Sequence, residues 1–337
     1  MGILNGIVAE HATNAAEIFT RAAADEFTQL LDAERATLDS LPSETAFAER
    51  NEIAPDFVRR FFESRFEAFS VNQGGSTTAA DKKNPCDNCG PLSGPVTTYV
   101  TGAGDGGEVS YNDVSQGGLN NCFVMASVAA VARTNPDAIR NMIQENRNER
   151  GEVISYTVTF HQKEDGLFGL GGGFKEVKVT VDANFPTNGK HANPGDRAAD
   201  GTQEIWPLVI EKAFAQLRGG YANIDKGGSA HEVMTALTGR DAEWKKPSDY
   251  TFKQLSADFA AGRAVVFDTT KGIPAELATK YGLVGWHSYV ATRVYSDKSG
   301  QWVELYNPWG PTAQQPTRVP YSEAAKIFSG INVVTTK

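Results

Sequence analysis

The first 97 residues fall into two stretches that differ in the spacing of their apolar positions. Between residues 8 and 70 the apolar side chains recur mostly every three or four positions, with a break at Leu41-Pro42. This spacing predicts helices with one apolar side. Five phenylalanines between Phe57 and Phe69 require a partner surface. We therefore expect a helical extension over 1–70 that pairs with itself or binds the rest of the chain. Residues 71–97 are rich in Gly, Ser, Asn and Pro without a period, which predicts a flexible linker.

The remaining chain combines helical and strand patterns. An almost entirely apolar or small run, Phe123 to Ala132, predicts a helix buried on all sides. Helices are also expected at 137–146 and 204–217, and strands at 152–160, 174–181, 263–268, 287–295 and 301–306. This order predicts an α+β fold that is helical over 98–226 and β-rich over 227–337.

The last two of these strands form a predicted hairpin. Their connection, Ser296 to Gly300, is polar and contains glycine. A hairpin centred near Lys298 pairs residues whose numbers sum to about 596. Asn307 then lies opposite Tyr289. His287 is its diagonal neighbour on the same face, roughly 5–8 Å away.

Cys122 is a candidate nucleophile. It lies between the segment Gln-Gly-Gly-Leu-Asn-Asn and the predicted buried helix. A helix N-terminus has unpaired N–H groups and partial positive charge, which favour the reactive thiolate over the thiol. A lone cysteine is more often a small buried core residue. The distant His287 and Asn307 favour a catalytic role for Cys122 over a core role. An imidazole can accept the thiol proton, and an amide oxygen can orient the ring.

Residues 307–310 read Asn-Pro-Trp-Gly, which matches a motif of the calpains, a group of papain-like cysteine peptidases. The resemblance extends from about Ser110 to the C-terminus. The other similar segments are Gln116-Gly117 with Cys122, Gly282-Leu283-Val284 before His287, Glu204 to Leu217, Gly227-Gly228-Ser229 with Thr238-Gly239, and Val179 to Pro186. Four residues depart from the family pattern in the segments around the candidate nucleophile and base: Asn120, Asn121, Phe123 and Ser288.

The resemblance implies a two-lobed papain-like core and roles for individual residues. It implies that Cys122, His287 and Asn307 are catalytic, that the Gln116 amide helps to form the oxyanion hole, and that Trp309 shields the His287–Asn307 hydrogen bond. It also implies calcium as a regulator bound by acidic loops, although the chemistry itself requires no cofactor. Asp105, Glu108 and Asp113 are candidate calcium ligands in the first lobe. The complete set of calcium ligands is not assigned residue by residue.

Composition restricts the classes of partner that this protein is expected to bind. The net charge of −9 argues against nucleic acid and against an anionic membrane surface. No apolar run reaches the ~18–20 residues of a membrane span, and the N-terminus has no signal-peptide pattern, so we expect a cytoplasmic protein. Cys86 and Cys89 form a lone Cys-x-x-Cys. That pair is read as an incidental loop pair, a local disulfide or half of a zinc site.

We therefore expect an endopeptidase that acts on proteins or peptides through an acyl-enzyme on Cys122. The helices of 1–70 would be an inhibitory prosegment bound to the catalytic core, with a cleavable linker at 71–97. Two alternatives remain. In the first, the same Cys-His-Asn set performs transglutaminase or deamidase chemistry, in which only the acyl acceptor differs from that of a peptidase. In the second, the protein is a binding module without catalysis.

Overall fold

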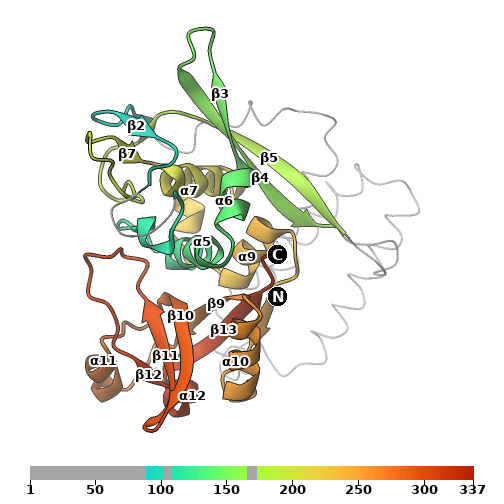
Figure 1. Ribbon diagram of the computed structural model, residues 1–337, viewed down its shortest axis with the longest axis vertical. Helices are drawn as coiled ribbons and strands as arrows, with labels where there is room; N and C mark the ends of the chain where they lie inside the picture. Colours follow the sequence, from blue (N-terminus) through green and yellow to red (C-terminus); the bar gives the residue numbers. More distant parts are fainter. Residues whose placement is uncertain (1–88, 102–107, 165–172) are drawn as a thin grey trace, which may run out of the picture. The chain divides into compact units, whose positions relative to one another are not determined.

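The computed structural model describes residues 89–101, 108–164 and 173–337 (Figure 1). All of them belong to the second of the two units into which the chain divides, Ala79–Lys337. The expected helical extension at 1–70 lies outside the described residues, as does 71–88. Residues 89–97, the end of the expected linker, contain two short strands, β1 (Cys89–Gly90) and β2 (Val96–Thr97).

The helices of the first half are α5 (Cys122–Thr134), α6 (Pro136–Met142), α7 (Trp206–Leu217), α8 (Tyr221–Ile224) and α9 (Ala230–Thr238), preceded by the 3₁₀-helix η2 (Tyr111–Asp113). The helices of the second half are α10 (Phe252–Ala260), α11 (Ala275–Tyr281) and α12 (Ala324–Ile327), with the 3₁₀-helix η4 (Tyr321–Glu323). α5 is buried along Phe123–Ala132, as expected from its composition.

The strands of the first half form a three-stranded antiparallel sheet and two small pairs. The sheet consists of β3 (Ile143–Arg147), β4 (Val153–Lys163) and β5 (Phe174–Asp182), in that order. β1 pairs with β6 (Phe185–Pro186), and β2 pairs with β7 (Gln203–Glu204). These pairs attach residues 89–97 to the first lobe.

The second half is built on a six-stranded antiparallel sheet in the order β12-β11-β10-β9-β13-β8. Its strands are β8 (Glu243–Lys245), β9 (Ala264–Thr269), β10 (Ser288–Asp297), β11 (Gly300–Tyr306), β12 (Val319–Pro320) and β13 (Phe328–Val334). In Figure 1, α5 and α9 lie between this sheet and the three-stranded sheet.

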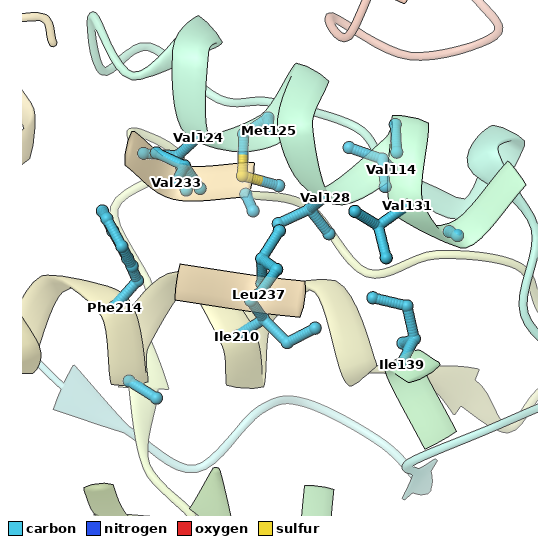
Figure 2. Close-up of a cluster of buried hydrophobic side chains, with 14 of the residues drawn as sticks. Val114, Val124, Met125, Val128, Val131, Ile139, Ile210, Phe214, Val233 and Leu237 are labelled. Atoms are coloured by element: carbon cyan, nitrogen blue, oxygen red, sulfur yellow. The ribbon is translucent and has the colours of Figure 1, made fainter. Parts of the chain in front are cut away.

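The core of the first lobe is one continuous apolar cluster. Side chains from α5, α6, α7 and α9 meet in it, and Figure 2 shows Met125 and Val128 of α5 beside Leu237 of α9. Because α9 follows residue 226, the first core includes a helix that the sequence assigned to the β-rich lobe. The reason is packing: α9 contacts α5 and β4, and its apolar face joins their cluster.

The six-stranded sheet is buried on both faces. Val266 and Val290 belong to the first apolar cluster, whereas their chain neighbours Phe267 and Tyr289 belong to a second one. Successive side chains of a strand point to opposite faces. One face of β9 and β10 therefore packs on the first lobe, and the other packs on the second cluster, to which α10, α11 and α12 contribute.

The expected hairpin register is confirmed at the end that leads to His287. Val290 pairs with Tyr306 and Ala291 with Leu305, so the residue numbers sum to 596 there. A bulge between Ala291 and Arg293 shifts the rest of the ladder by one residue. The expected helix at 137–146 is wrong in its second half, because Ile143–Arg147 pair with β4 as a strand. In the part of the chain that the structure describes, no helix is long and apolar enough to cross a membrane.

Candidate active site

Cys122 is the first residue of α5, directly after the N-cap residue Asn121. It is a free thiol with partial exposure to solvent. The run of small and apolar residues behind it forms the buried helix, and the polar Asn120-Asn121 pair ends the preceding loop. The N–H groups of the first turn of a helix have no acceptor within the helix. The backbone N–H of Cys122 is therefore placed to donate to a negative oxygen beside the sulfur.

Ser288 lies beside the thiol. Burial raises the pKa of Cys122, the polar backbone N–H and hydroxyl groups of Ser288 lower it in part, and the charge of Asp268 raises it further. Ser288 directly follows His287, so the structure brings the sulfur to the start of β10. The raised pKa differs from the expectation for a helix N-terminus, because loss of water outweighs the partial charge of the helix. The isolated group is therefore a thiol at neutral pH.

His287 and Asn307 are joined by a hydrogen bond, with 2.9 Å between His287 Nε2 and Asn307 Oδ1. Both side chains are buried, and burial lowers the pKa of His287, with the Asn307 bond raising it in part. An amide oxygen accepts, so Nε2 holds the proton and Nδ1 keeps a lone pair. The Asn307 amide is fixed in turn, since its Nδ2 donates to the Gln314 carbonyl at 3.2 Å.

Trp309 covers this pair. Its ring centroid lies 4.8 Å from that of His287, at an interplanar angle of 47°. The backbone N–H of Trp309 also donates to Asn307 Oδ1 at 3.1 Å. The indole is 40 % exposed, so it lies between solvent and the imidazole. This placement fits the shielding role that the family resemblance implies.

Gln116 lies in a loop that is bonded to the Asn307 segment. Its backbone N–H donates to the Pro308 carbonyl at 2.7 Å, and the Tyr306 hydroxyl donates to the Val114 carbonyl at 2.9 Å. The Gln116 side-chain Nε2 donates to the Leu119 carbonyl at 2.6 Å. An amide nitrogen has two hydrogens, so one remains for a second acceptor. The structure thus brings the loop before Cys122 and the loop that contains Asn307 together.

Gly117 lets this loop lie against residues 190–191. A β-carbon at Gly117 would lie 2.1 Å from the His191 carbonyl oxygen, whereas one at Gly118 would lie 3.8 Å from its nearest neighbour. We expect Gly117→Ala to lower the free energy of unfolding by about 2 kcal/mol or more, because backbone atoms must move. The same movement should displace Gln116.

Gly118→Ala is the matched control for this substitution. It should leave the urea midpoint close to that of the wild type, because its β-carbon makes an ordinary contact. Equal effects of the two substitutions would contradict the proposed close approach at Gly117.

A buried carboxyl supports the residue before the nucleophile. Asn121 Nδ2 donates to Glu211 Oε1 at 2.7 Å, and the Ala192 backbone N–H donates to both Glu211 oxygens at 3.0–3.1 Å. Burial raises the pKa of Glu211 from 4.5 to about 7, against these hydrogen bonds. Asn121, which departs from the family pattern, therefore has a hydrogen-bond partner in α7. The sequence pattern did not identify this contact.

Replacement of Glu211 by glutamine should change how stability depends on pH. A raised carboxyl pKa in the folded state means that the stabilisation is complete below pH 4.5 and is lost as the pH rises through about 7. Glutamine does not titrate, so the stability difference between Glu211→Gln and wild type should shift in favour of the variant by roughly 3 kcal/mol between pH 4 and pH 8.

Urea unfolding across that pH range, performed with Cys122→Ala in both proteins to prevent self-cleavage, measures this difference. A difference that stays constant with pH would contradict the raised pKa. Glu232→Gln is the control, because Glu232 is exposed and bonded only to Arg218.

Sequence reasoning missed a second polar chain beside the sulfur. The Ser288 hydroxyl donates to Asp268 Oδ1 at 2.6 Å, and Asn332 Nδ2 donates to Asp268 Oδ2 at 2.6 Å. Burial raises the pKa of Asp268, and these two bonds lower it in part. The available signal was the position of Asp268 and Asn332 within strongly apolar strands, where an isolated polar residue needs a partner.

The first lobe also contains two buried carboxyl groups, of Asp113 and Glu204, that interact through their charges. Asp113 accepts from Trp206 Nε1 at 3.2 Å, and Glu204 accepts from the Val100 backbone N–H at 2.9 Å. Burial and the charge of Asp113 raise the pKa of Glu204 to about 9. Of the other expected calcium ligands, Glu108 is exposed and Asp105 lies outside the described residues. No group of three or more His, Cys, Asp or Glu residues with metal-site geometry occurs in 89–101, 108–164 or 173–337.

The other described cysteine, Cys89, lies in β1. Cys89 is disulfide-bonded, which favours the disulfide over the loop and zinc readings. Cys86 lies outside the described residues.

Comparisons with known proteins agree with the geometry. Residues 105–331 match the calpain family cysteine protease domain. The chain is 28 % identical to mouse (Mus musculus) calpain-9 over 241 residues, which is 68 % of this chain and 32 % of that protein. It is 29 % identical to the human (Homo sapiens) calpain-2 catalytic subunit over 219 residues, 60 % of this chain and 29 % of that protein. Human calpain-8 is 27 % identical over 242 residues, 68 % of this chain and 30 % of that protein. The chain thus spans about a third of the length of these curated relatives.

Proposed function

The chain belongs to the calpain family of cysteine proteases, and on that premise we propose that it is an endopeptidase that cleaves proteins through an acyl-enzyme on Cys122. One observation carries the proposal. His287 and Asn307 are joined by a hydrogen bond of 2.9 Å, and His287 directly precedes Ser288, which lies beside the Cys122 sulfur. A nucleophile beside a base that is itself oriented is the arrangement that thiol hydrolysis needs.

In the first half of the reaction, Cys122 gives its proton to His287 Nδ1, because Nε2 is bonded to Asn307. The sulfur then forms a bond to the peptide carbonyl carbon. The backbone N–H of Cys122 and the Gln116 amide donate to the resulting oxyanion. Collapse of this intermediate breaks the C–N bond, and His287 gives the proton to the departing amine. The product is a thioester on Cys122.

In the second half, a water molecule gives a proton to His287 and attacks the thioester carbonyl. The C–S bond breaks, the sulfur recovers a proton from His287, and the carboxylic acid leaves. Burial favours the neutral form of both Cys122 and His287 before substrate binds. The thiolate therefore forms only with proton transfer to His287, which makes the imidazole essential.

Casein and a thiol-reactive epoxide test the proposal. We expect cleavage of casein, loss of cleavage after epoxide treatment, and a label on Cys122 in the mapped peptides. Cleavage that continues in the fully labelled protein would overturn the proposal. Incorporation of an added primary amine without cleavage would instead identify an acyl transferase.

We further propose that calcium binds between Asp113 and Glu204. Two buried carboxyl groups beside one another repel when both are ionised, and a divalent cation relieves that repulsion. Backbone carbonyl oxygens of the same loops would complete the oxygen ligands that calcium requires. In the second lobe, no acidic residue occurs between Asn307 and Glu323, so the loop after the Asn-Pro-Trp-Gly motif offers calcium no carboxylate.

Calcium should raise the thermal midpoint of the protein by about 5–10 °C at a hundredfold excess over its dissociation constant. Glu204 must lose its proton to bind the ion, and burial and Asp113 raise its pKa to about 9, so the shift should grow from pH 6 to pH 8. Glu204→Gln should abolish the shift, whereas Glu243→Gln, at an exposed ion pair of the second lobe, should retain it. An unchanged midpoint in the wild type would contradict the site.

Finally, we propose that residues 1–70 are an inhibitory prosegment and that 71–88 include the cleavage site. The predicted apolar helices would cover the catalytic core until the chain is cut. The pairing of residues 89–90 and 96–97 with the first lobe supports a cut before Cys89, because a paired strand is a poor protease substrate.

A further inference from the structure

Trp286 is the most exposed large apolar side chain of the described residues, at 72 %. It directly precedes His287, the proposed base. A single exposed apolar residue is ordinary on a protein surface. An indole with most of its area in water is more costly than a small side chain, because aromatic rings contribute large apolar areas. The exposure of the Trp286 indole beside the proposed base therefore needs a physical explanation.

The backbone of Trp286 is strained. Its φ is 53°, and in the described part of the chain it is the sole non-glycine residue with a positive φ. A bulky side chain in this region is an outlier, and glycine would adopt the same conformation at little cost. Strained residues persist where the surrounding structure fixes them, and they cluster at functional sites.

Hydrogen bonds on both sides fix this conformation. The Trp286 N–H donates to the Thr270 carbonyl at 3.3 Å, and the His287 N–H donates to the Thr269 hydroxyl at 2.9 Å. Gly285 lies against the Lys271 carbonyl oxygen, which a β-carbon would approach to 2.8 Å. The direction of the indole is therefore set by β9 and the residues after it, and not by contacts of the ring with a core.

Trp286 is joined to the catalytic site through His287, the residue that follows it in the chain. Trp309, 40 % exposed, lies 4.8 Å from the His287 ring, and Val284 is 40 % exposed two residues before Trp286. Lys271 Nζ lies 5.1 Å from the centre of the Trp286 ring, so a cation contacts the ring while most of the indole stays open to solvent. His287 gives its proton to the departing amine, so groups around it lie beside the leaving half of the substrate.

We propose that Trp286 is a specificity-determining residue whose indole binds an apolar side chain of the substrate on the C-terminal side of the cleaved bond. This inference rests on the proposed peptidase function. Contact with a flat aromatic surface favours apolar and aromatic side chains by removing both surfaces from water. Lys271 at the ring disfavours a basic side chain at the same position by charge repulsion.

Sequencing of casein fragments by mass spectrometry tests the proposal, because it identifies the residue after each cut. The full-length wild type should cut before Leu, Ile, Phe and similar residues about tenfold more often than before Gly or Lys. Trp286→Gly should lose this preference, so that the ratio of cuts before apolar residues to cuts before Gly falls to about one. Because glycine relieves the positive φ, the variant should be at least as stable as the wild type.

Trp244→Ala is the control, since Trp244 is 50 % exposed on β8, with β13 and β9 between it and β10; its preference should match the wild type. An apolar preference that survives in Trp286→Gly would overturn the inference, as would an equal loss of cleavage before every residue type. If the wild type cuts no peptide, the proposed function fails. Binding then decides the inference: an apolar peptide should bind about tenfold more weakly to Trp286→Gly than to the wild type, and equal binding would overturn it.

Discussion

Replacement of Cys122 by alanine is expected to abolish casein cleavage, with a fall of at least about 10⁴-fold in kcat/KM. In the proposed mechanism the Cys122 sulfur forms the acyl bond, and no other described residue lies in its place beside Ser288 and at the start of α5. The fold should persist, because Cys122 is partly exposed at the first position of a helix and alanine is the best helix former. We expect the free energy of unfolding to change by less than about 1 kcal/mol.

Urea unfolding and casein hydrolysis of the same preparations measure both quantities. Cleavage by Cys122→Ala at a rate near that of the wild type would remove Cys122 from the mechanism. The same pair of proteins tests the prosegment. Wild type should cut itself within 71–88 during incubation and become more active, whereas Cys122→Ala should stay intact. Equal fragmentation of both proteins would indicate a contaminating protease.

Replacement of His287 by alanine is expected to lower kcat by about 10²–10⁴-fold. Burial keeps Cys122 in the thiol form near neutral pH, so loss of the base leaves a thiol without a proton acceptor. Alkylation of Cys122 by iodoacetamide reports this directly. In His287→Ala, the reaction should require a higher pH than in the wild type, because no imidazole accepts the proton.

His161→Ala is the matched control for this variant. His161 lies in β4 and its Nδ1 is 3.4 Å from the Ala236 carbonyl oxygen, within the first lobe. Its replacement should change neither kcat nor the pH dependence of alkylation. An alkylation profile of His287→Ala that coincides with the wild type would show that the imidazole does not act on the thiol.

Local patterns were sufficient for most of the fold. The continuous apolar run after Cys122 predicted a helix buried on all sides, and α5 is buried along that run. The turn centred near Lys298 predicted the register that places His287 near Asn307, and the ladder has that register at Val290–Tyr306. The bulge near Ala291 could not be predicted, because an extra residue on one strand leaves no signal in an alternating sequence.

Long-range contacts explain what the sequence did not predict. Ile143–Arg147 continue a helical pattern locally, but pairing with β4 makes them a strand, since strand preference depends on neighbours. The predicted direction of the Cys122 pKa shift was also wrong, because burial raises the pKa of this thiol and the charge of Asp268 raises it further; no property of the helix alone indicates either effect. Ser288 was noted only as a departure from a family pattern, and its bond to Asp268 joins two strands whose pairing had not been predicted.

The hydrogen bonds that connect Val114 and Gln116 with Tyr306 and Pro308 have a consequence for protein synthesis. These partners are separated by 192 residues in both cases, so a growing chain carries its nucleophile long before it carries the carbonyl and hydroxyl that fix the neighbouring loop. His287 and Asn307 also emerge late. Until Pro308 has left the ribosome, these hydrogen bonds cannot hold the loop before Cys122 against the segment that contains Asn307.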